Sequence, residues 1–313
     1  MQTSSWLKWA ILEGLTKTGS RTLQKVIGVV SQSWGGIFLA SGIVGLVQVI
    51  VASFEMKRRN IRFFGDTVGA IGSAIFGILA LVITVLGFAI FLKGGDVGTT
   101  SFIFTISIVP GMLLDMIFFR YKSTIREWVG MSIAIFAGWA ILGFPRSFTH
   151  MPLWVWLAIS LMLLAAVNQA VTRAIKEVDP MFKNFWGGLM AVIITPVILV
   201  WIGQSHLMIE SGNSKLWITS MMIGIIVIAM WSFNLLSYQH KASIALKKLV
   251  MGASHLISSV AVGCLFFGES LTFWKAMSLP TYCLAFILMD KKAWEYARSA
   301  YTRNAIVSHY GEP

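Results

Sequence analysis

Charged residues are scarce in this sequence. Asp, Glu, Lys and Arg make up 12% of the 313 residues, and the 13 acids are outnumbered by 25 bases. Soluble globular chains carry about a quarter charged residues. Because 57% of the residues are hydrophobic, a soluble fold of this length could not bury so much apolar surface. The composition therefore excludes a soluble domain and predicts a protein embedded in lipid.

Cysteine and the common cofactor motifs are also scarce or absent. Cys264 and Cys283 both fall in apolar stretches, where thiols are expected to pack as small apolar side chains and not to form a disulfide or a metal pair. The sequence has no CxxC, HExxH or Walker motif, so we expect no metal or other cofactor and no ATP hydrolysis. It also lacks the pattern of a removable signal peptide.

Long uncharged stretches are frequent instead. A membrane-spanning helix needs about 20 mainly apolar residues, and the uncharged runs are 26–54, 67–92, 97–114, 128–145, 147–172, 184–209, 216–240, 249–268 and 276–289. They lack the polar alternation of a membrane barrel, and lipid forbids unsatisfied backbone groups. The sequence predicts an all-α polytopic membrane protein.

A further helix at the N-terminus brings the expected number to ten. The predicted helices are 5–25, 27–54, 67–92, 97–119, 127–145, 152–173, 182–204, 216–239, 246–268 and 272–289. With this division, most of the Lys and Arg residues fall in alternate loops on one side. Because cytoplasmic loops collect positive charge, we expect an integral protein of the cytoplasmic (inner) membrane with both termini in the cytoplasm. The tail 290–313 is expected on the cytoplasmic surface, and lipid headgroups explain the basic charge without nucleic acid.

The two halves of the chain resemble each other weakly. Residues 93–123 align with 239–269, and residues 20–26 align with 172–178, without gaps. The alignment predicts one five-helix repeat in 1–145 and a second in 146–289. Because five is odd, the second repeat would be inverted with respect to the first, which is a recurrent plan of secondary carriers.

Three residues at corresponding helices carry a resemblance to a known family. Pro110 lies within the fourth predicted span, and Gly268-Glu269 ends the ninth as part of the stretch 267–272, FGESLT. With the glycine-punctuated stretch 126–142, these features resemble the drug/metabolite transporter superfamily, ten-helix carriers with an EamA-type repeat. Ser123 stands where the first-half acid is expected, and Leu256 where the second-half proline is expected. The resemblance implies a carrier fold but no single substrate, because the superfamily handles amino acids, sugars, nucleotide sugars, phosphorylated metabolites and drugs.

Polar residues of the first helix indicate a binding site. Trp9, Glu13, Lys17, Ser20 and Gln24 recur at helical spacing, so they share one face, and ionisable groups inside a bilayer tend to face a cavity or one another. The alternative for Glu13 and Lys17 is a plain intrahelical pair. Glu13 is also a candidate for proton coupling.

A second polar face lies on the ninth helix. Lys248, Gly252, His255 and Ser259 share it, and the lysine and histidine could donate to an anion. The alternatives are that Lys247 and Lys248 anchor the helix end in the headgroups and that His255 is packed and hydrogen-bonded. Its ordinary titration near neutrality makes His255 the second coupling candidate.

Other polar residues suit a small organic ligand. Trp231, Asn234 and Tyr238 share a face of the eighth helix, and the sixth offers Gln169. Aromatic walls with a few amides are typical of ligand sites, although the same residues also link membrane helices to one another. Asp115 is expected to form a structural pair with Arg120.

These features favour a secondary transporter over an enzyme. We expect alternating access for a small polar metabolite that is amino acid-like, zwitterionic or anionic, with a proton or a counter-substrate as coupling partner. The alternatives are an intramembrane lipid-modifying enzyme and a channel or scaffold without transport. The sequence identifies neither the substrate, nor the direction of flux, nor the oligomeric state.

Overall fold

The computed structural model describes residues 5–31, 33–141, 151–208, 213–289 and 294–295, and this part of the chain is helical without a strand. The tail predicted to lie at the membrane surface falls almost wholly outside it. The helices are α1 (Ser5–Ser31), α2 (Trp34–Arg58), α3 (Thr67–Leu92), α4 (Val97–Thr105), α5 (Ile108–Phe119), α6 (Ile125–Ile141), α7 (Leu153–Ala174), α8 (Pro180–Trp201), η2 (Ser205–Met208), α9 (Ser214–Gln239), α10 (Ile244–Phe267) and α11 (Phe273–Met289).

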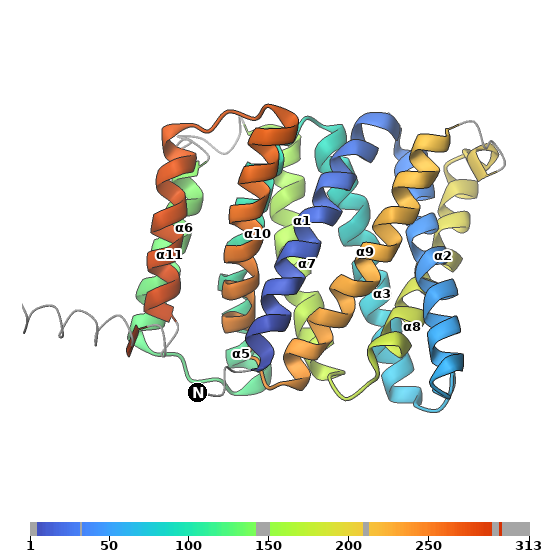
Figure 1. Cartoon of the computed structure of the whole chain (residues 1–313), viewed down its shortest axis with the longest axis horizontal. Helices are drawn as coiled ribbons and strands as arrows, with labels where there is room; N and C mark the ends of the chain where they lie inside the picture. The colour runs from blue at the N-terminus through green and yellow to red at the C-terminus, as the bar shows by residue number, and fades with distance from the viewer. Residues whose placement is uncertain (1–4, 32, 142–150, 209–212, 290–293, 296–313) are drawn as a thin grey trace, which may run out of the picture.

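Seven of these segments are long and apolar enough to cross a membrane. They are α2, α3, the combined α4–α5 segment, α7, α8, α9 and most of α10. The expectation of an all-α polytopic membrane protein is therefore confirmed. In Figure 1, α1, α6 and α11 run alongside the others from one end of the molecule to the other.

Short polar side chains fix where several helices begin. Asp66, Asp96 and Asp179 each precede a helix, and each carboxylate accepts a hydrogen bond from a backbone N–H of its first turn. Such caps satisfy N–H groups that have no partner within the helix. At the start of α6, Thr124 and Glu127 bond reciprocally to each other's backbone N–H, as in a capping box.

The first two helices differ from the sequence prediction. The uncharged run from residue 26 suggested that the first helix ends at Lys25, whereas α1 continues to Ser31 and α2 begins at Trp34. The Ser33 side chain accepts a hydrogen bond from the Gly36 N–H and caps α2. Arg21 and Lys25, which we expected at the end of the span facing away from the basic loops, therefore lie inside α1.

The fourth span is interrupted near its middle. α4 ends at Thr105 and α5 begins at Ile108, with Pro110 in the first turn of α5. Proline has no N–H and its ring clashes with the carbonyl four residues earlier, which here belongs to Ile106. The Ile106 carbonyl instead accepts from the Val109 N–H at 2.9 Å, and the helix resumes on a new start.

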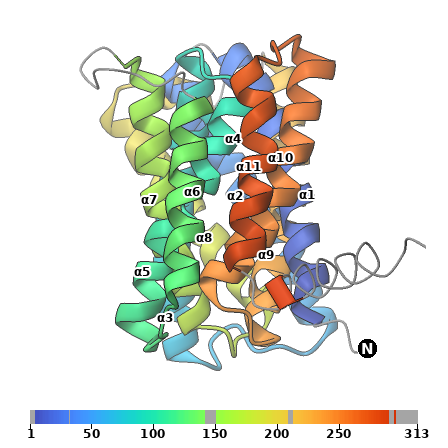
Figure 2. The same ribbon diagram turned by 90° about the vertical axis from the view of Figure 1, so that its left-hand side faces the viewer.

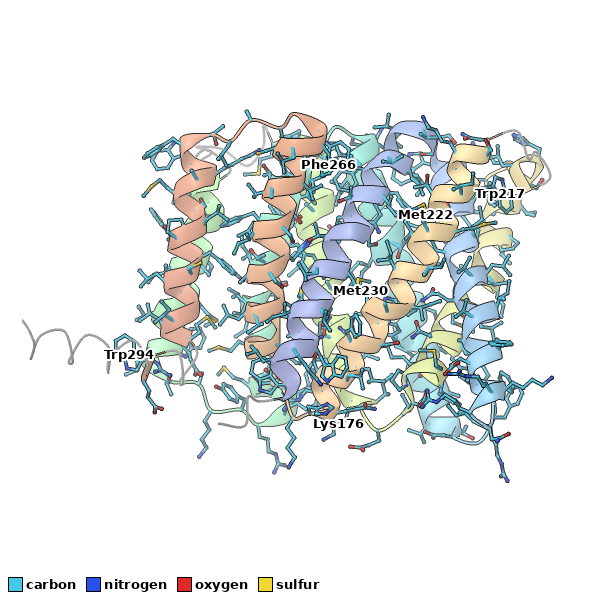
Figure 3. The ribbon with its side chains drawn as sticks, viewed as in Figure 1. Lys176, Trp217, Met222, Met230, Phe266 and Trp294 are labelled. Carbon is cyan, nitrogen blue, oxygen red and sulfur yellow. The ribbon has the colours of Figure 1, made fainter. Side chains whose placement is uncertain are left out.

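The turns alternate between two ends of the molecule. Those after α2, α5, α7 and α9 lie at the lower end of Figure 1, and those after α1, α3, α8 and α10 lie at the upper end. Figure 3 shows Lys176 at the lower end and Trp217 and Phe266 at the upper end. The lower end is the one for which the sequence predicts the basic loops. Which end faces the cytoplasm stays a prediction.

Corresponding helices of the two predicted halves have corresponding neighbours. α1 packs on α9 and α10, and α7 packs on α3 and on the α4–α5 segment. In the same way α2 packs on α8 and α9, and α8 packs on α2 and α3. α6 and α11 pack mainly on each other, side by side at one edge of the bundle (Figure 2).

Candidate functional site

A polar cavity lies inside the bundle, midway between the two ends. α1, α3, α4, α7 and α9 contribute its walls, and Met230, one of the lining residues, marks its level in Figure 3. The space open to the centres of water molecules is about 80 Å³, which is enough for several waters. The cavity therefore has room for a small ligand.

Most polar groups of the cavity come from one face of α1. The lining residues include Glu13, Lys17, Ser20, Arg21 and Gln24 of α1, Asn168 and Gln169 of α7, Trp231 and Asn234 of α9, and the aromatic rings of Phe76 and Phe104. The α1 residues recur every three or four positions, so a single helical face carries them.

Glu13 belongs to a buried ion pair between distant helices. Its Oε2 lies 2.7 Å from Nζ of Lys247 on α10, and both side chains are almost completely buried. Its Oε1 accepts a hydrogen bond from Nδ2 of Asn234 at 2.9 Å. No ion pair between Glu13 and Lys17 is present among the described residues, and Lys247 takes the place that the intrahelical alternative gave to Lys17. The headgroup anchoring of Lys247 is wrong, because a carboxylate from α1 draws its ammonium group inward.

Gln169 extends this pair into a network. Its Oε1 accepts hydrogen bonds from Lys247 Nζ at 2.7 Å, Tyr238 OH at 2.7 Å and Asn234 Nδ2 at 2.9 Å. Four helices, α1, α7, α9 and α10, are thus tied together below the cavity. Buried charges are stable when they are paired, and here the Lys247 ammonium pairs with the Glu13 carboxylate while Asn234 donates to its Oε1.

Three cations surround one aromatic ring of the cavity wall. Distances to the Phe104 ring centroid are 3.4 Å from Lys17 Nζ, 5.7 Å from Arg21 Cζ and 5.5 Å from Lys248 Nζ. Arg21 Nη1 donates to Gln24 Oε1 at 2.9 Å, and Lys248 Nζ donates to Ser107 Oγ at 2.8 Å. Within the described part of the chain, none of the three cations forms an ion pair with a carboxylate.

Lys183 adds a fourth cation behind the cavity wall. It is completely buried, and its Nζ donates to the Trp231 carbonyl and to Asn234 Oδ1, each at 3.3 Å. The same Nζ lies 4.0 Å from the centroid of the Phe76 ring. Together these four basic side chains outnumber Glu13, the single acid among the described residues that line the cavity, so the site offers an anion more partners than it offers a cation.

The second polar face, on α10, meets α1 beside the cavity. His255 is completely buried; its Nδ1 lies 2.9 Å from Thr18 Oγ1 and 3.1 Å from Ser259 Oγ. Its Nε2 has no hydrogen-bond partner among the described residues. The packed, hydrogen-bonded arrangement described for His255 as an alternative is present at Nδ1, and a role in coupling stays a prediction.

Two ion pairs flank the cavity, one toward each end. Toward the upper end, Lys25 on α1 pairs with Glu269, which follows α10, at 2.6 Å. Toward the lower end, Arg173 on α7 pairs with Asp115 on α5. Asp115 therefore pairs with Arg173 and not with Arg120 as we expected. Each pair joins a helix of one predicted half to the fourth span of the other.

The structure brings half of the predicted site residues into the cavity. The lining includes Glu13, Lys17, Gln169, Trp231 and Asn234. Tyr238 reaches it through Gln169, while Lys248, His255 and Ser259 contact α1 or Ser107 from α10. Trp9 stacks on Phe233 with a centroid distance of 5.6 Å, away from the cavity. Of the family-motif residues, Pro110 lies at the break between α4 and α5, and Gly268 and Glu269 lie at the upper end.

Sequence reasoning missed Arg21, Phe104 and Lys183. Arg21 lies four residues beyond Lys17, so the spacing of the predicted α1 face, which reached Gln24, could have included it. Lys183 was the second residue of the predicted helix 182–204, and the Asp179-Pro180 start of α8 could have placed it further from the helix end, because proline is favoured at a first helical position. No sequence signal distinguishes Phe104 from the other aromatic residues.

The described residues contain no group of three or more His, Cys, Asp or Glu that could hold a metal ion, and both cysteines are free thiols.

Among known proteins, no family model and no curated protein matches the chain. Solved structures do match, in 28 chains. One of them, described as "Crystal structure of protein", has a TM-score of 0.61 and 11% sequence identity, with 88% of this chain and 97% of that chain covered. A likeness at this identity concerns the fold alone.

Proposed function

We propose that this protein is a secondary transporter that carries a small polar metabolite across a membrane by alternating access. The observation that carries the proposal is the polar cavity midway between the two ends of the bundle, flanked toward each end by an ion pair between helices of different halves. Ionisable groups inside membrane proteins mark substrate and ion pathways. A scaffold would need no such cavity.

The proposed architecture has ten membrane helices in two inverted repeats. α1 joins the seven apolar spans because Glu13, Lys17 and Arg21 line the cavity, and α6 and α11 join as a packed pair alongside the rest. Exchanging the two sets of five helices converts the α1–α9 contact into the α7–α3 contact and the α2–α9 contact into the α8–α3 contact. This agreement supports the repeat, as does the resemblance of Pro110 and Gly268-Glu269 to the drug/metabolite transporter superfamily.

The two ion pairs would act as closures at opposite ends. Rocking one repeat against the other would separate Lys25 from Glu269 in one state and Arg173 from Asp115 in the other, exposing the same cavity to either side. The basic loops of the lower end favour a cytoplasmic orientation for that end, with both termini there.

Counterflow in proteoliposomes tests transport directly. Proteoliposomes that contain the protein are loaded with pooled amino acids, sugars, organic acids or phosphorylated metabolites. The same pool, labelled, is then added to the external medium. Saturable exchange of one class supports a carrier. Folded protein that exchanges nothing would refute it, and flux that never saturates would identify a channel.

Cysteine accessibility tests the alternating closures without knowledge of the substrate. Ala80 lines the cavity, so Ala80→Cys in a chain without Cys264 and Cys283 reports access of a membrane-impermeant thiol reagent. Arg173→Gln should raise labelling from the lower side, and Lys25→Gln from the upper side. Arg58→Gln is the matched control, because its pair with Glu55 is exposed and lies within one helix. Equal labelling of all variants from both sides would contradict the proposed closures.

A further inference from the structure

We propose that the ligand of the cavity is a small organic acid whose anionic group binds between Lys17 and Arg21, and that the protein exchanges one such anion for another. This inference rests on the proposed transport function and narrows its substrate class. It excludes zwitterions and neutral sugars as the main substrates.

The first step of the argument is the unpaired positive charge. Lys17 and Arg21 lie one turn apart on the same face of α1, and both line the cavity. In the described part of the chain, Lys17 Nζ contacts the Phe104 ring and lies 3.9 Å from Met251 Sδ, and it forms no ion pair with a carboxylate. Arg21 gives one hydrogen bond to a neutral amide. Buried charges are ordinarily paired or bound to ions, so these two cations are suited to an anion that enters from outside.

The second step is that the cavity offers no carboxylate for a cationic ligand group. Glu13 is the only acid among its lining residues, and its two oxygens are already engaged by Lys247 and Asn234. The ammonium of an amino acid would have to displace Lys247, leaving a buried lysine unpaired. A ligand with net negative charge needs no such rearrangement.

The third step concerns the rest of the ligand. The remaining lining includes apolar side chains, among them Ile83, Val227, Met230 and the Trp231 ring. These suit a short carbon skeleton. Asn168 adds an acceptor, because its buried Oδ1 has no partner in the described part of the chain, so a hydroxyl on the ligand would find a position there. The small volume favours such an acid over sugar phosphates.

The exchange mode follows from the same charges. Passing through an occluded state with an empty cavity would keep Lys17 and Arg21 unpaired in a medium of low dielectric constant, which is unfavourable. A bound anion compensates them. The loaded protein should therefore change its direction of access much faster than the empty one, and efflux should require an anion on the opposite side.

Binding and exchange are measured separately. Thermal unfolding of the purified protein in detergent is followed with pyruvate, lactate, malate or inorganic phosphate, and with glutamine and lysine for comparison. A ligand that binds only the folded protein raises its unfolding temperature, so at least one of the organic acids should do so. Efflux of labelled acid from proteoliposomes should rise tenfold or more when the same acid is added outside.

The variants separate a binding role from a structural one. Lys17→Met and Arg21→Gln should abolish the acid-induced shift, and Lys17→Arg should retain it. Without ligand, Lys17→Met should unfold at the same or a higher temperature than the parent protein, because a half-buried cation that forms no ion pair has been removed; a purely structural role predicts a lower temperature. Lys57→Ala, at an exposed position, is the control that should change nothing.

The outcomes distinguish this inference from the transport proposal. Saturable exchange of glutamine, lysine or sugars without any effect of the acids would keep the carrier and overturn the anion site. Acid binding that depends on Lys17 and Arg21, without transport of anything, would support the site and overturn the carrier. Stabilisation by inorganic phosphate but by no organic acid would overturn the ligand class, and net uptake into empty vesicles as fast as exchange would overturn the exchange mode.

Discussion

Glu269 links the end of α10 to two other helices through one carboxylate. Its Oε1 lies 2.6 Å from Lys25 Nζ on α1 and accepts the Val97 N–H at 2.6 Å, and its Oε2 accepts the Gly98 N–H at 3.0 Å. The last two groups are the first backbone donors of α4. Gly268 precedes the acid with φ +63°, a conformation that glycine adopts without strain and that turns the chain so that Glu269 reaches α4.

We expect Glu269→Ala to destabilise the protein and to weaken closure of the upper end. The substitution leaves two N–H donors of α4 and the Lys25 ammonium without their acceptor, and hydrogen bonds to a charged group each contribute about 1.5–3 kcal/mol. Thermal unfolding in detergent measures the loss, and labelling of Ala80→Cys from the upper side should increase.

Glu269→Gln separates the two roles of this side chain. Its amide oxygen can still accept from a backbone N–H of α4 but carries no charge for Lys25. We therefore expect stability between the parent and Glu269→Ala. If Gln proved as destabilising as Ala, the ion pair with Lys25 would account for the whole effect and capping of α4 would contribute little.

The Glu13–Lys247 pair gives a sharper test, because both side chains are buried. Removing one partner of a buried pair costs about 3–5 kcal/mol, since the other charge is left uncompensated. Lys247→Met and Glu13→Gln should each lower the unfolding temperature strongly. The double variant should be more stable than Lys247→Met, because it leaves no lone carboxylate. A double-mutant cycle that gave simple additivity would contradict a direct pairing.

The bounds of some apolar helices followed from the sequence where charge marked their ends. α3 has the predicted bounds, Thr67–Leu92, because Asp66 caps one end and Lys93 follows the other. The end of the first helix was wrong because charge is a poor marker when charged residues face an interior. Lys25 lies inside α1 because Glu269 neutralises it, and that partner is far away in the sequence.

The candidate site could be predicted in part for a similar reason. Helical spacing alone selected Glu13 and Lys17, since a regular period needs no tertiary information. The partner of Glu13 could not be predicted, because Lys247 sits where cationic residues commonly anchor a helix end. Only the packing of α1 against α10 shows that its ammonium group turns inward. The arrangement of three cations about Phe104 also depends on the packing of α4 against α1 and α10.

Close contact between α3 and α8 predicts a strict requirement for glycine. A Cβ added at Gly77 would overlap the backbone of Gly187, whereas one added at Gly19 would meet only Ile226 Cδ1 at 3.7 Å, an ordinary contact. Because backbone atoms cannot rotate away, Gly77→Ala should separate the helices and destabilise the protein by about 1–3 kcal/mol. Gly19→Ala is the matched control and should leave thermal stability unchanged or slightly raised. Equal stability of the two variants would show that α3 and α8 can move apart freely.

Pro110 predicts a hinge between α4 and α5. In Pro110→Ala the new N–H at position 110 can bond to the Ile106 carbonyl, so the break should close into a continuous helix. Because proline disfavours a helix interior by about 3 kcal/mol relative to alanine, the variant should be as stable as the parent or more stable by up to about that amount. If the break allows the cavity-lining Phe104 to move with the change in access, exchange should slow while ligand-induced stabilisation persists.

Hydrogen exchange measures this effect independently of transport. The amides of residues 106–109 and 111 should exchange more slowly in Pro110→Ala than in the parent, since the break is replaced by regular helical bonds. Pro196→Ala is the control, because Pro196 lies within α8, a helix described without interruption, at an exposed position. Pro196→Ala should raise the thermal stability without altering the rate at which the protein exchanges its substrate across the membrane. Pro110→Ala could instead leave both the amide protection at 106–109 and 111 and the transport rate unchanged. That result would show that the α4–α5 break persists without the proline, and that neighbouring contacts such as Lys248 with Ser107 impose it.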